Sequence, residues 1–159
     1  MTTAVRSADM IIGITPFGEP DAGLALAVGR AGGLGVLDLG DGRRRAREAL
    51  SRLRREAPGG FAVRIGPRCR LSPADLAGTD GPHTVVLAPD TTWPFTGPAG
   101  GEGAPARLLA EVTDLAAARR AARAGADGLI ARGCESGGRT GTLSTFVLLQ
   151  QLLSAPDLD

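Results

Sequence analysis

The sequence predicts an α/β protein in which strands and helices alternate along the chain and the strands form a parallel sheet. Two observations support this fold class. Short apolar runs recur at regular intervals, and most are continuous rather than alternating with polar residues, as expected for strands buried on both faces. Between these runs, apolar residues follow helical spacing. This alternation indicates successive βα units.

Six apolar runs are candidate strands. They are IIGIT (11–15), GVLDL (35–39), FAVRI (61–65), TVVLA (84–88), RLLAEV (107–112) and DGLIA (127–131). A closed (β/α)8 barrel needs eight such strands. The predicted fold is therefore an incomplete (β/α)8, TIM-barrel-like arrangement of about six parallel βα units, forming a single domain over residues 1–159.

The first predicted helix spans residues 20–33. Pro20 and Asp21 favour a first helical turn, and Gly32 and Gly33 favour a stop. The same glycines belong to GRAGGLG (29–35), which is similar to a dinucleotide-binding fingerprint. That motif must follow a strand and open a helix, whereas this one follows a helix, so we interpret it as a helix stop and a turn.

The other predicted helices have apolar stripes and capping residues at the expected spacing. The stripe of the segment 42–60 is Ala46, Ala49, Leu50, Leu53 and Ala57, and that of the segment 113–126 is Leu115, Ala118 and Ala122. The expected N-caps are Ser72 for a short helix at 72–78 and either Thr113 or Asp114 for the next one. The run LSTFVLLQQLLSAP (143–156) forms the last helix.

The fourth unit and the end of the chain depart from this pattern. Residues 91–106 are rich in proline and glycine and lack helical periodicity, so we expect a loop in place of the fourth helix. The chain ends where another strand is expected to begin. We therefore interpret it as a segment of a larger polypeptide, with two open sheet edges.

Composition excludes several kinds of chemistry. All 18 basic residues are Arg, so a Schiff-base lysine is excluded, and the chain has no Tyr and a single His, His83. A net charge of +1 gives no general attraction to nucleic acid or to membranes. The apolar runs are too short for a signal peptide or a membrane span, so we expect a cytoplasmic protein. Cys69 and Cys134 form no metal-binding pattern, and no metal is expected.

The glycine-rich stretch GCESGGRTGT (133–142) lies between the sixth predicted strand and the last helix. Counted from Gly133, it has the spacing of a phosphate-binding Walker loop, but Arg139 replaces the lysine of that motif. In a barrel, the loops after the strands form the functional face. Glycines there let backbone N–H groups approach a ligand. The residues alone leave open a ligand-binding loop and a simple glycine-rich connector.

Two further features are interpreted as structural. The arginines between residues 43 and 55 surround the apolar stripe of one helix, which favours a solvated outer face, with docking to an acidic partner domain as the alternative. His83 precedes the fourth strand. It is therefore expected on the face opposite the functional loops.

The run GADGLIARGCESGGRTGTLSTFVLLQQL (125–152) resembles a segment of the nitronate monooxygenase family and of its relative, the flavin-dependent bacterial enoyl-ACP reductase. These proteins carry the signature G-x-E-[AS]-G-G-H-x-G after the sixth strand of an FMN-binding TIM barrel. The segments AVGRAGGLGVL (27–37) and VTDLAAARRAARAGAD (112–127) are similar to other parts of the family. The resemblance implies an FMN-dependent oxidoreductase.

The resemblance also implies roles for individual residues. Gly137 and Gly138 would offer backbone to the flavin, Glu135 would anchor the loop, and the segment Ile14, Thr15 and Pro16 would lie along the isoalloxazine. Arg64 stands where the family usually has an Asn directed toward the flavin. The family's phosphate cradle follows strands seven and eight, which this chain lacks.

Arg139 is the most consequential departure, because it replaces the signature His. In the monooxygenases that His is the expected proton acceptor, whereas an Arg stays charged and cannot act as a base near neutral pH. The catalytic candidate Arg139 is therefore expected to bind an anionic substrate or to stabilise the reduced flavin.

Two functions follow from the resemblance. The first is an FMN-dependent oxidoreductase, truncated or degenerate, that acts on a small-molecule or acyl-carrier-bound substrate. The second rests on GITPFGEPD (13–21) and on the arginine in the signature, which also resemble the front part of some large bacterial polyketide or polyunsaturated fatty-acid synthases. It is a non-catalytic, barrel-derived module in contact with further domains of the same polypeptide. Neither function involves nucleic acid or a membrane.

Overall fold

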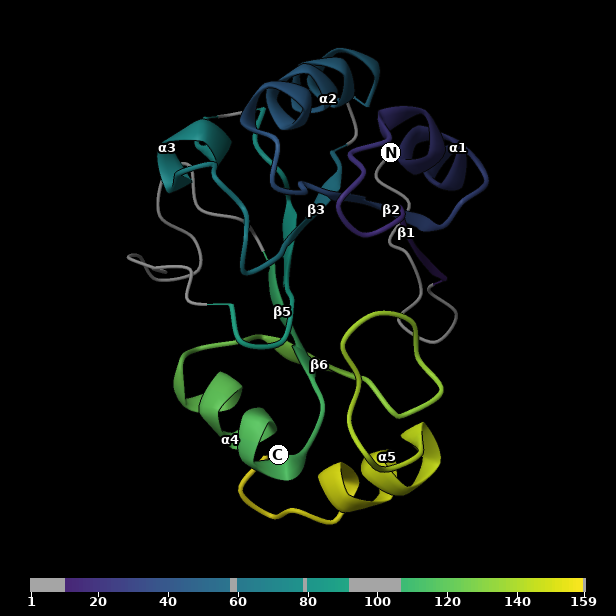
Figure 1. The fold of residues 1–159 in the computed structure, drawn as a ribbon, viewed down its shortest axis with the longest axis vertical. Helices are drawn as coiled ribbons and strands as arrows, with labels where there is room; N and C mark the ends of the chain where they lie inside the picture. Colours follow the sequence, from purple (N-terminus) through teal and green to yellow (C-terminus); the bar gives the residue numbers. More distant parts are fainter. Residues whose placement is uncertain (1–10, 58–59, 79, 92–106, 159) are drawn as a thin grey trace, which may run out of the picture.

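The computed structural model describes residues 11–57, 60–78, 80–91 and 107–158. Its centre is a parallel sheet of six strands that lie side by side in chain order. The strands are β1 (Ile12–Ile14), β2 (Leu34–Asp38), β3 (Ala62–Ile65), β4 (Thr84–Leu87), β5 (Arg107–Val112) and β6 (Gly128–Ala131). The sheet curls into a half barrel with the helices outside it (Figure 1). The predicted TIM-barrel-like fold and all six candidate strands are confirmed.

Five helices lie among the described residues. They are α1 (Ala22–Arg30), α2 (Arg43–Glu56), α3 (Pro73–Leu76), α4 (Leu115–Arg123) and α5 (Thr145–Leu153). Helices α1, α2 and α3 cover one part of the curved sheet, and α4 and α5 cover the other (Figure 1). The predicted loop at 91–106 lies outside the described residues except for Thr91.

Asp114 is one of the two predicted caps, whereas Asp21, expected in the first turn of its helix, is instead the N-cap of α1. The Asp21 carboxylate accepts a hydrogen bond from the N–H of Leu24 at 3.1 Å, which fixes the start of α1. Of the two candidates for α4, Asp114 is the cap, since its carboxylate accepts from the N–H of Ala117 at 2.7 Å. At the end of α1, Gly32 adopts a φ of 89°, the left-handed conformation that commonly stops a helix. The structure therefore confirms the interpretation of GRAGGLG as a helix stop.

The two faces of the sheet carry different residues, because successive side chains of a strand point to opposite faces. The outer face packs against α1 and α2 through a large apolar cluster that includes Leu37, Val63 and Val85. The inner face has a smaller cluster centred on Val36 and Ala62. The core of the molecule therefore lies between the sheet and the helices.

The predicted helix faces are mostly confirmed. In α2, Ala46, Ala49, Leu50 and Leu53 are buried, and Ala57 packs against the same cluster. In α4, Ala118 is fully buried.

The expectation that Ala122 faces inward is wrong, because this residue is exposed. Ala117 and Ala121 take its place in a cluster with Leu152 and Leu158. Helix α4 packs on α5 and the chain end as well as on the sheet, and this turns its buried stripe away from Ala122.

The arginines of α2 lie on its solvent side, as predicted. Arg44 pairs with Glu48 at 2.7 Å, and Arg47 pairs with Asp75 of α3 at 2.6 Å. The pKa of Asp75 is held well below its usual range, first by the N–H of Ser72 and then by the Arg47 guanidinium.

In the described part of the chain, no helix is long and apolar enough to span a membrane.

Candidate functional site

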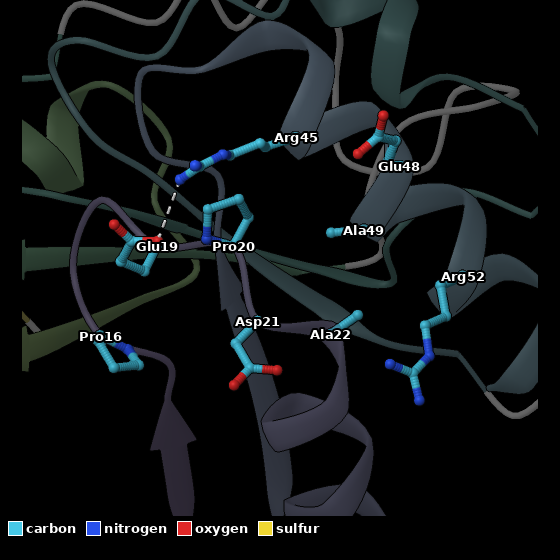
Figure 2. Close-up of a pocket in the computed structure, with 9 residues that line it drawn as sticks. All are labelled: Pro16, Glu19, Pro20, Asp21, Ala22, Arg45, Glu48, Ala49 and Arg52. Atoms are coloured by element: carbon cyan, nitrogen blue, oxygen red, sulfur yellow. Dashed lines mark ion pairs between the residues drawn. The ribbon is translucent and has the colours of Figure 1, made fainter.

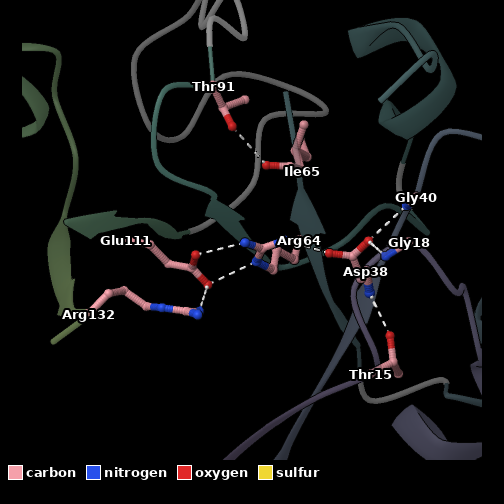
Figure 3. A network of polar contacts seen from close by, with 9 residues as sticks. All are labelled: Thr15, Gly18, Asp38, Gly40, Arg64, Ile65, Thr91, Glu111 and Arg132. Atoms are coloured by element: carbon pink, nitrogen blue, oxygen red, sulfur yellow. Dashed lines mark hydrogen bonds and ion pairs between the residues drawn. The ribbon is translucent and has the colours of Figure 1, made fainter. Parts of the chain in front are cut away.

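Four buried charged residues form a row across the carboxyl end of the inner sheet face (Figure 3). They are Asp38, Arg64, Glu111 and Arg132, with exposed fractions of 2%, 6%, 3% and 6%. Each lies two residues after an apolar residue of the inner cluster, so the alternation of the strands places all four on the same face. We call these four residues the ion quartet.

Arg64 is the centre of the ion quartet. Its Nη1 donates to Asp38 at 2.6 Å, while its Nε and Nη2 donate to the two oxygens of Glu111 at 2.9 and 2.8 Å. Burial alone would lower the pKa of this guanidinium, but the hydrogen bonds and negative charges of Glu111 and Asp38 outweigh burial and raise it. Arg64 therefore ties β3 to both β2 and β5.

Glu111 and Asp38 have different surroundings. Glu111 is shared, because its Oε1 also accepts from Nη1 of Arg132 at 3.0 Å. Asp38 faces the β1 side, where its Oδ1 accepts from the backbone N–H groups of Gly18 and Gly40 at 3.0 and 2.9 Å. The two negative charges thus lie at separate places in the row.

The aromatic ring of Phe17 covers the quartet. The guanidinium carbon of Arg64 lies 4.2 Å from the ring centroid, and that of Arg132 lies 5.2 Å from it, within the range of cation–π contacts. The ring also meets the loop after β6, since a Cβ added to Gly138 would lie 2.5 Å from Cε2 of Phe17. Loops from the first and last strands of the sheet therefore meet over the quartet.

The glycine-rich loop is anchored to the start of α5 by Glu135. Its Oε1 accepts from the backbone N–H of Thr145 at 2.8 Å. Hydrogen bonds from backbone N–H groups, including that of Thr145, lower the pKa of Glu135. The Ser144 hydroxyl accepts from the N–H of Val147 at 3.3 Å. Both side chains occupy N–H groups that an uncapped helix would offer to an anion.

Arg139 lies at the rim of this site and pairs with Asp90, which follows β4. The side chains of Arg139 and Asp90 are 68% and 52% exposed. Arg139 is thus held by a surface ion pair between the loops after β4 and β6.

The end of β1 and the residues after it lie in two places: Ile14 and Thr15 lie near the quartet, and Pro16 lies at a groove beside α1. Thr15 is buried, and its Oγ1 accepts from the N–H of Asp38 at 2.9 Å. Ile14 belongs to the inner apolar cluster. Pro16 instead lines a groove between the start of α1 and α2 (Figure 2), together with Glu19, Pro20, Asp21, Ala22, Arg45, Glu48, Ala49 and Arg52.

The structure gathers most of the residues singled out from the sequence at one end of the half barrel. Ile14, Thr15, Arg64 and Gly138 lie at or next to the quartet, while Gly137 faces open space. Sequence reasoning missed Phe17, Asp38, Glu111 and Arg132. A usable signal was present, because three of the apolar runs carry or are followed by a single charged residue near the carboxyl end, in GVLDL, RLLAEV and DGLIAR.

Solved structures similar to this one include two of FabK. FabK from Thermotoga maritima matches with a TM-score of 0.65 and 28% sequence identity, over 89% of this chain and 46% of FabK. A methionine-to-alanine mutant of the same protein matches with a TM-score of 0.68 and 28% identity, over 90% of this chain and 49% of the mutant. The chain thus spans about half the length of these neighbours. No protein-family model and no curated protein matches it.

The site fits one end of FMN. Near the quartet it offers an aromatic side chain, glycine backbone and one buried donor without a partner, the Nε of Arg132, and an isoalloxazine ring carries acceptors for such a donor. For the phosphate, the described residues provide no comparable site at α5, whose first N–H groups are already capped.

Within the described ranges, no group of three His, Cys, Asp or Glu side chains could hold a metal ion.

Proposed function

We propose that this chain is the ring-binding part of an FMN-dependent oxidoreductase of the enoyl reductase type. The observation that carries the proposal is the meeting of Phe17 and Gly138 over the ion quartet, at the carboxyl ends of the strands, where barrel enzymes bind their ligands. The likeness to FabK over most of this chain supports it. The substrate class proposed is a small-molecule or acyl-carrier-bound enoyl thioester.

The proposal divides the work between cofactor and protein. Bound FMN would supply hydride transfer, and the protein would supply binding, orientation and electrostatics. Ile14, Thr15 and the backbone of Gly137 and Gly138 would border the ring. Glu135 would hold the glycine loop in place through its contact with α5.

Arg139 favours a reductase over a nitronate monooxygenase. A monooxygenase acting on nitroalkanes needs a group that accepts a proton, and a guanidinium does not do this near neutral pH. Reduction of an enoyl thioester needs no base, because hydride adds to the β carbon and the α carbon then takes up a proton, for which solvent is the source. We assign to Arg139 the binding of an anionic part of the substrate, because its exposed position at the rim suits a ligand arriving from solvent.

Flavin titration tests the proposal. The purified chain is titrated with FMN and, separately, with riboflavin, while quenching of flavin fluorescence and the visible absorption spectrum are recorded. We expect saturable one-to-one binding. Riboflavin should bind within about ten-fold of FMN, because the described residues recognise the ring and not the phosphate. A folded chain that binds neither flavin at millimolar concentration would contradict the proposal.

The second candidate is a non-catalytic module of a larger synthase. It is favoured by the ion quartet itself, because all three guanidinium nitrogens of Arg64 donate to Asp38 or Glu111, which gives this side chain a structural role in the sheet. Cooperative unfolding together with no flavin binding would support this candidate. Reduction of crotonyl-pantetheine by NADPH in the presence of FMN would exclude it.

A further inference from the structure

Arg132 is the one member of the ion quartet with an unused buried donor. Its side chain is 8% exposed and makes a single contact with a carboxylate, from Nη1 to Glu111. Its Nε is buried and has no hydrogen-bond partner. A buried polar group without a partner costs free energy, so this N–H is expected to find an acceptor in a water, an ion or a ligand.

The quartet is neutral overall, with two guanidiniums and two carboxylates, and Arg132 is the guanidinium at one end of the row. Glu111 carries one negative charge between two guanidiniums, and Arg64 takes both of its oxygens. Asp38 is occupied by Arg64 and by the N–H groups of Gly18 and Gly40 at the other end of the row. The end of the quartet next to Arg132 is therefore the end that would attract an anionic or strongly polar oxygen.

Phe17 and the glycine loop both lie against Arg132. The ring centroid of Phe17, a residue that is 43% exposed, lies 5.2 Å from the guanidinium carbon, and a Cβ added to Gly138 would lie 3.4 Å from Nη2 of Arg132. The neighbouring Gly137 has no atoms around it that would meet an added Cβ. Movement of the partly exposed Phe17 side chain would uncover the face of the Arg132 guanidinium that the ring now contacts.

We propose that the free edge of Arg132 is a binding subsite for a carbonyl or anionic oxygen of a flat, conjugated ligand that displaces the Phe17 ring. Such a ligand keeps the stacking on the guanidinium that Phe17 now provides, and it supplies the acceptor that Nε lacks. This inference rests on the proposed function. Two ligands carry a suitable oxygen acceptor for this subsite. One is the pyrimidine edge of a flavin, and the other is the carbonyl of an enoyl thioester.

Binding measurements on the full chain test the subsite and distinguish the two sources of the oxygen. Wild type, Arg132→Gln and the control Arg119→Gln are titrated with FMN and with crotonyl-pantetheine in separate experiments, and folding is checked by circular dichroism. Arg119 pairs with Asp157 on the exposed surface of α4, so its replacement removes the same charge far from the site. We expect Arg132→Gln to weaken at least one probe about ten-fold or more and Arg119→Gln to leave both unchanged.

Glu111→Gln separates binding from a purely structural role of Arg132. It removes the neighbouring negative charge while preserving the shape of the side chain, so a ligand subsite should bind its probe roughly three-fold tighter or better. A residue that merely supports the fold predicts weaker or unchanged binding. This variant also keeps the test decisive if Arg132→Gln does not fold.

The outcomes discriminate this inference from the proposed function. If wild type binds FMN and both Arg132→Gln and Glu111→Gln bind it and the thioester equally well, the subsite is refuted and the proposed function stands. If folded wild type binds neither probe, both are refuted. Weakening of FMN alone identifies the flavin as the source of the oxygen, and weakening of the thioester alone identifies the substrate.

Discussion

At the scale of single residues, the contact between Gly138 and Phe17 decides how the mouth of the half barrel is covered. Gly138 has a φ of 76°, a conformation that side-chain-bearing residues adopt at a cost of about 1–2 kcal/mol. The adjacent Gly137 has an ordinary φ and open space around its Cα. Two consecutive glycines of one signature therefore serve different purposes.

We expect Gly138→Ala to lower the free energy of unfolding by about 1–3 kcal/mol, because the new methyl group meets the Phe17 ring and the backbone conformation is strained. Gly137→Ala is the matched control and should change stability by less than about 0.5 kcal/mol. Urea denaturation of both variants measures the difference. Adding Phe17→Ala to Gly138→Ala should recover the steric part of the loss, and equal effects of the two glycine substitutions would argue against this contact.

At the scale of elements, the ion quartet connects strands that are not all neighbours. Arg64 on β3 reaches past β4, where Val86 is its partner in register, to Glu111 on β5. It also contacts Asp38, its partner in register on β2. The network thus fixes the curvature of the sheet at the end where the loops gather.

Arg64→Met should destabilise the protein by about 3–5 kcal/mol, because it leaves two buried carboxylates without their main partner. The control is Arg47→Met, which breaks the ion pair with Asp75 at a side chain that is 53% exposed and should cost no more than about 1 kcal/mol. Chemical denaturation of both variants tests the ranking. A loss for Arg64→Met as small as that for Arg47→Met would show that the quartet does not hold the sheet.

At the scale of the whole molecule, the described sheet has two open edges, and the candidate site lies at one end of its strands. Among the described strands, β1 and β6 each pair with a single neighbour, and α5 leaves Phe146 and Leu153 exposed at 70% and 82%. The quartet and the two meeting loops lie at the carboxyl ends of the strands. His83 lies at the opposite end, directly before β4, as its position in the sequence predicted.

His83 should make the stability of the whole molecule depend on pH. Its pKa is lowered from the usual 6.5, mainly by burial and then by the charge of Arg107. Below about pH 6.5 the unfolded chain therefore binds more protons at this residue than the folded chain, so stability falls as the pH falls. We expect the free energy of unfolding to decrease between about pH 7.5 and pH 5.5.

The control for this prediction is His83→Gln, which should show a flatter profile over the same pH range. Glu135 and Asp75 do not contribute there, because their lowered pKa values place their titration at more acidic pH. Identical profiles for wild type and His83→Gln would assign the pH dependence to another group.

The six strands could be predicted from the sequence because each is a short continuous apolar run, and burial on both faces requires that pattern in a parallel sheet. The caps at Asp21 and Asp114 were equally local, since each serves the N–H group three residues later. The buried face of α4 could not be predicted in full. Its choice of Ala121 over Ala122 depends on α5 and the chain end, which are remote in sequence.

The candidate site also has some features that the sequence predicted and others that only the tertiary structure revealed. The sequence alone determined that a glycine loop follows the sixth strand, and its resemblance to a known signature singled out Arg139 and Arg64 within the candidate site. Only the tertiary structure decided that Asp38, Glu111 and Arg132 converge on Arg64, that Phe17 covers them, and that Arg132 keeps a donor without a partner. The reason is physical: strand patterns depend on neighbouring residues, whereas an ion pair depends on the curvature of a sheet that brings together residues up to 47 positions apart.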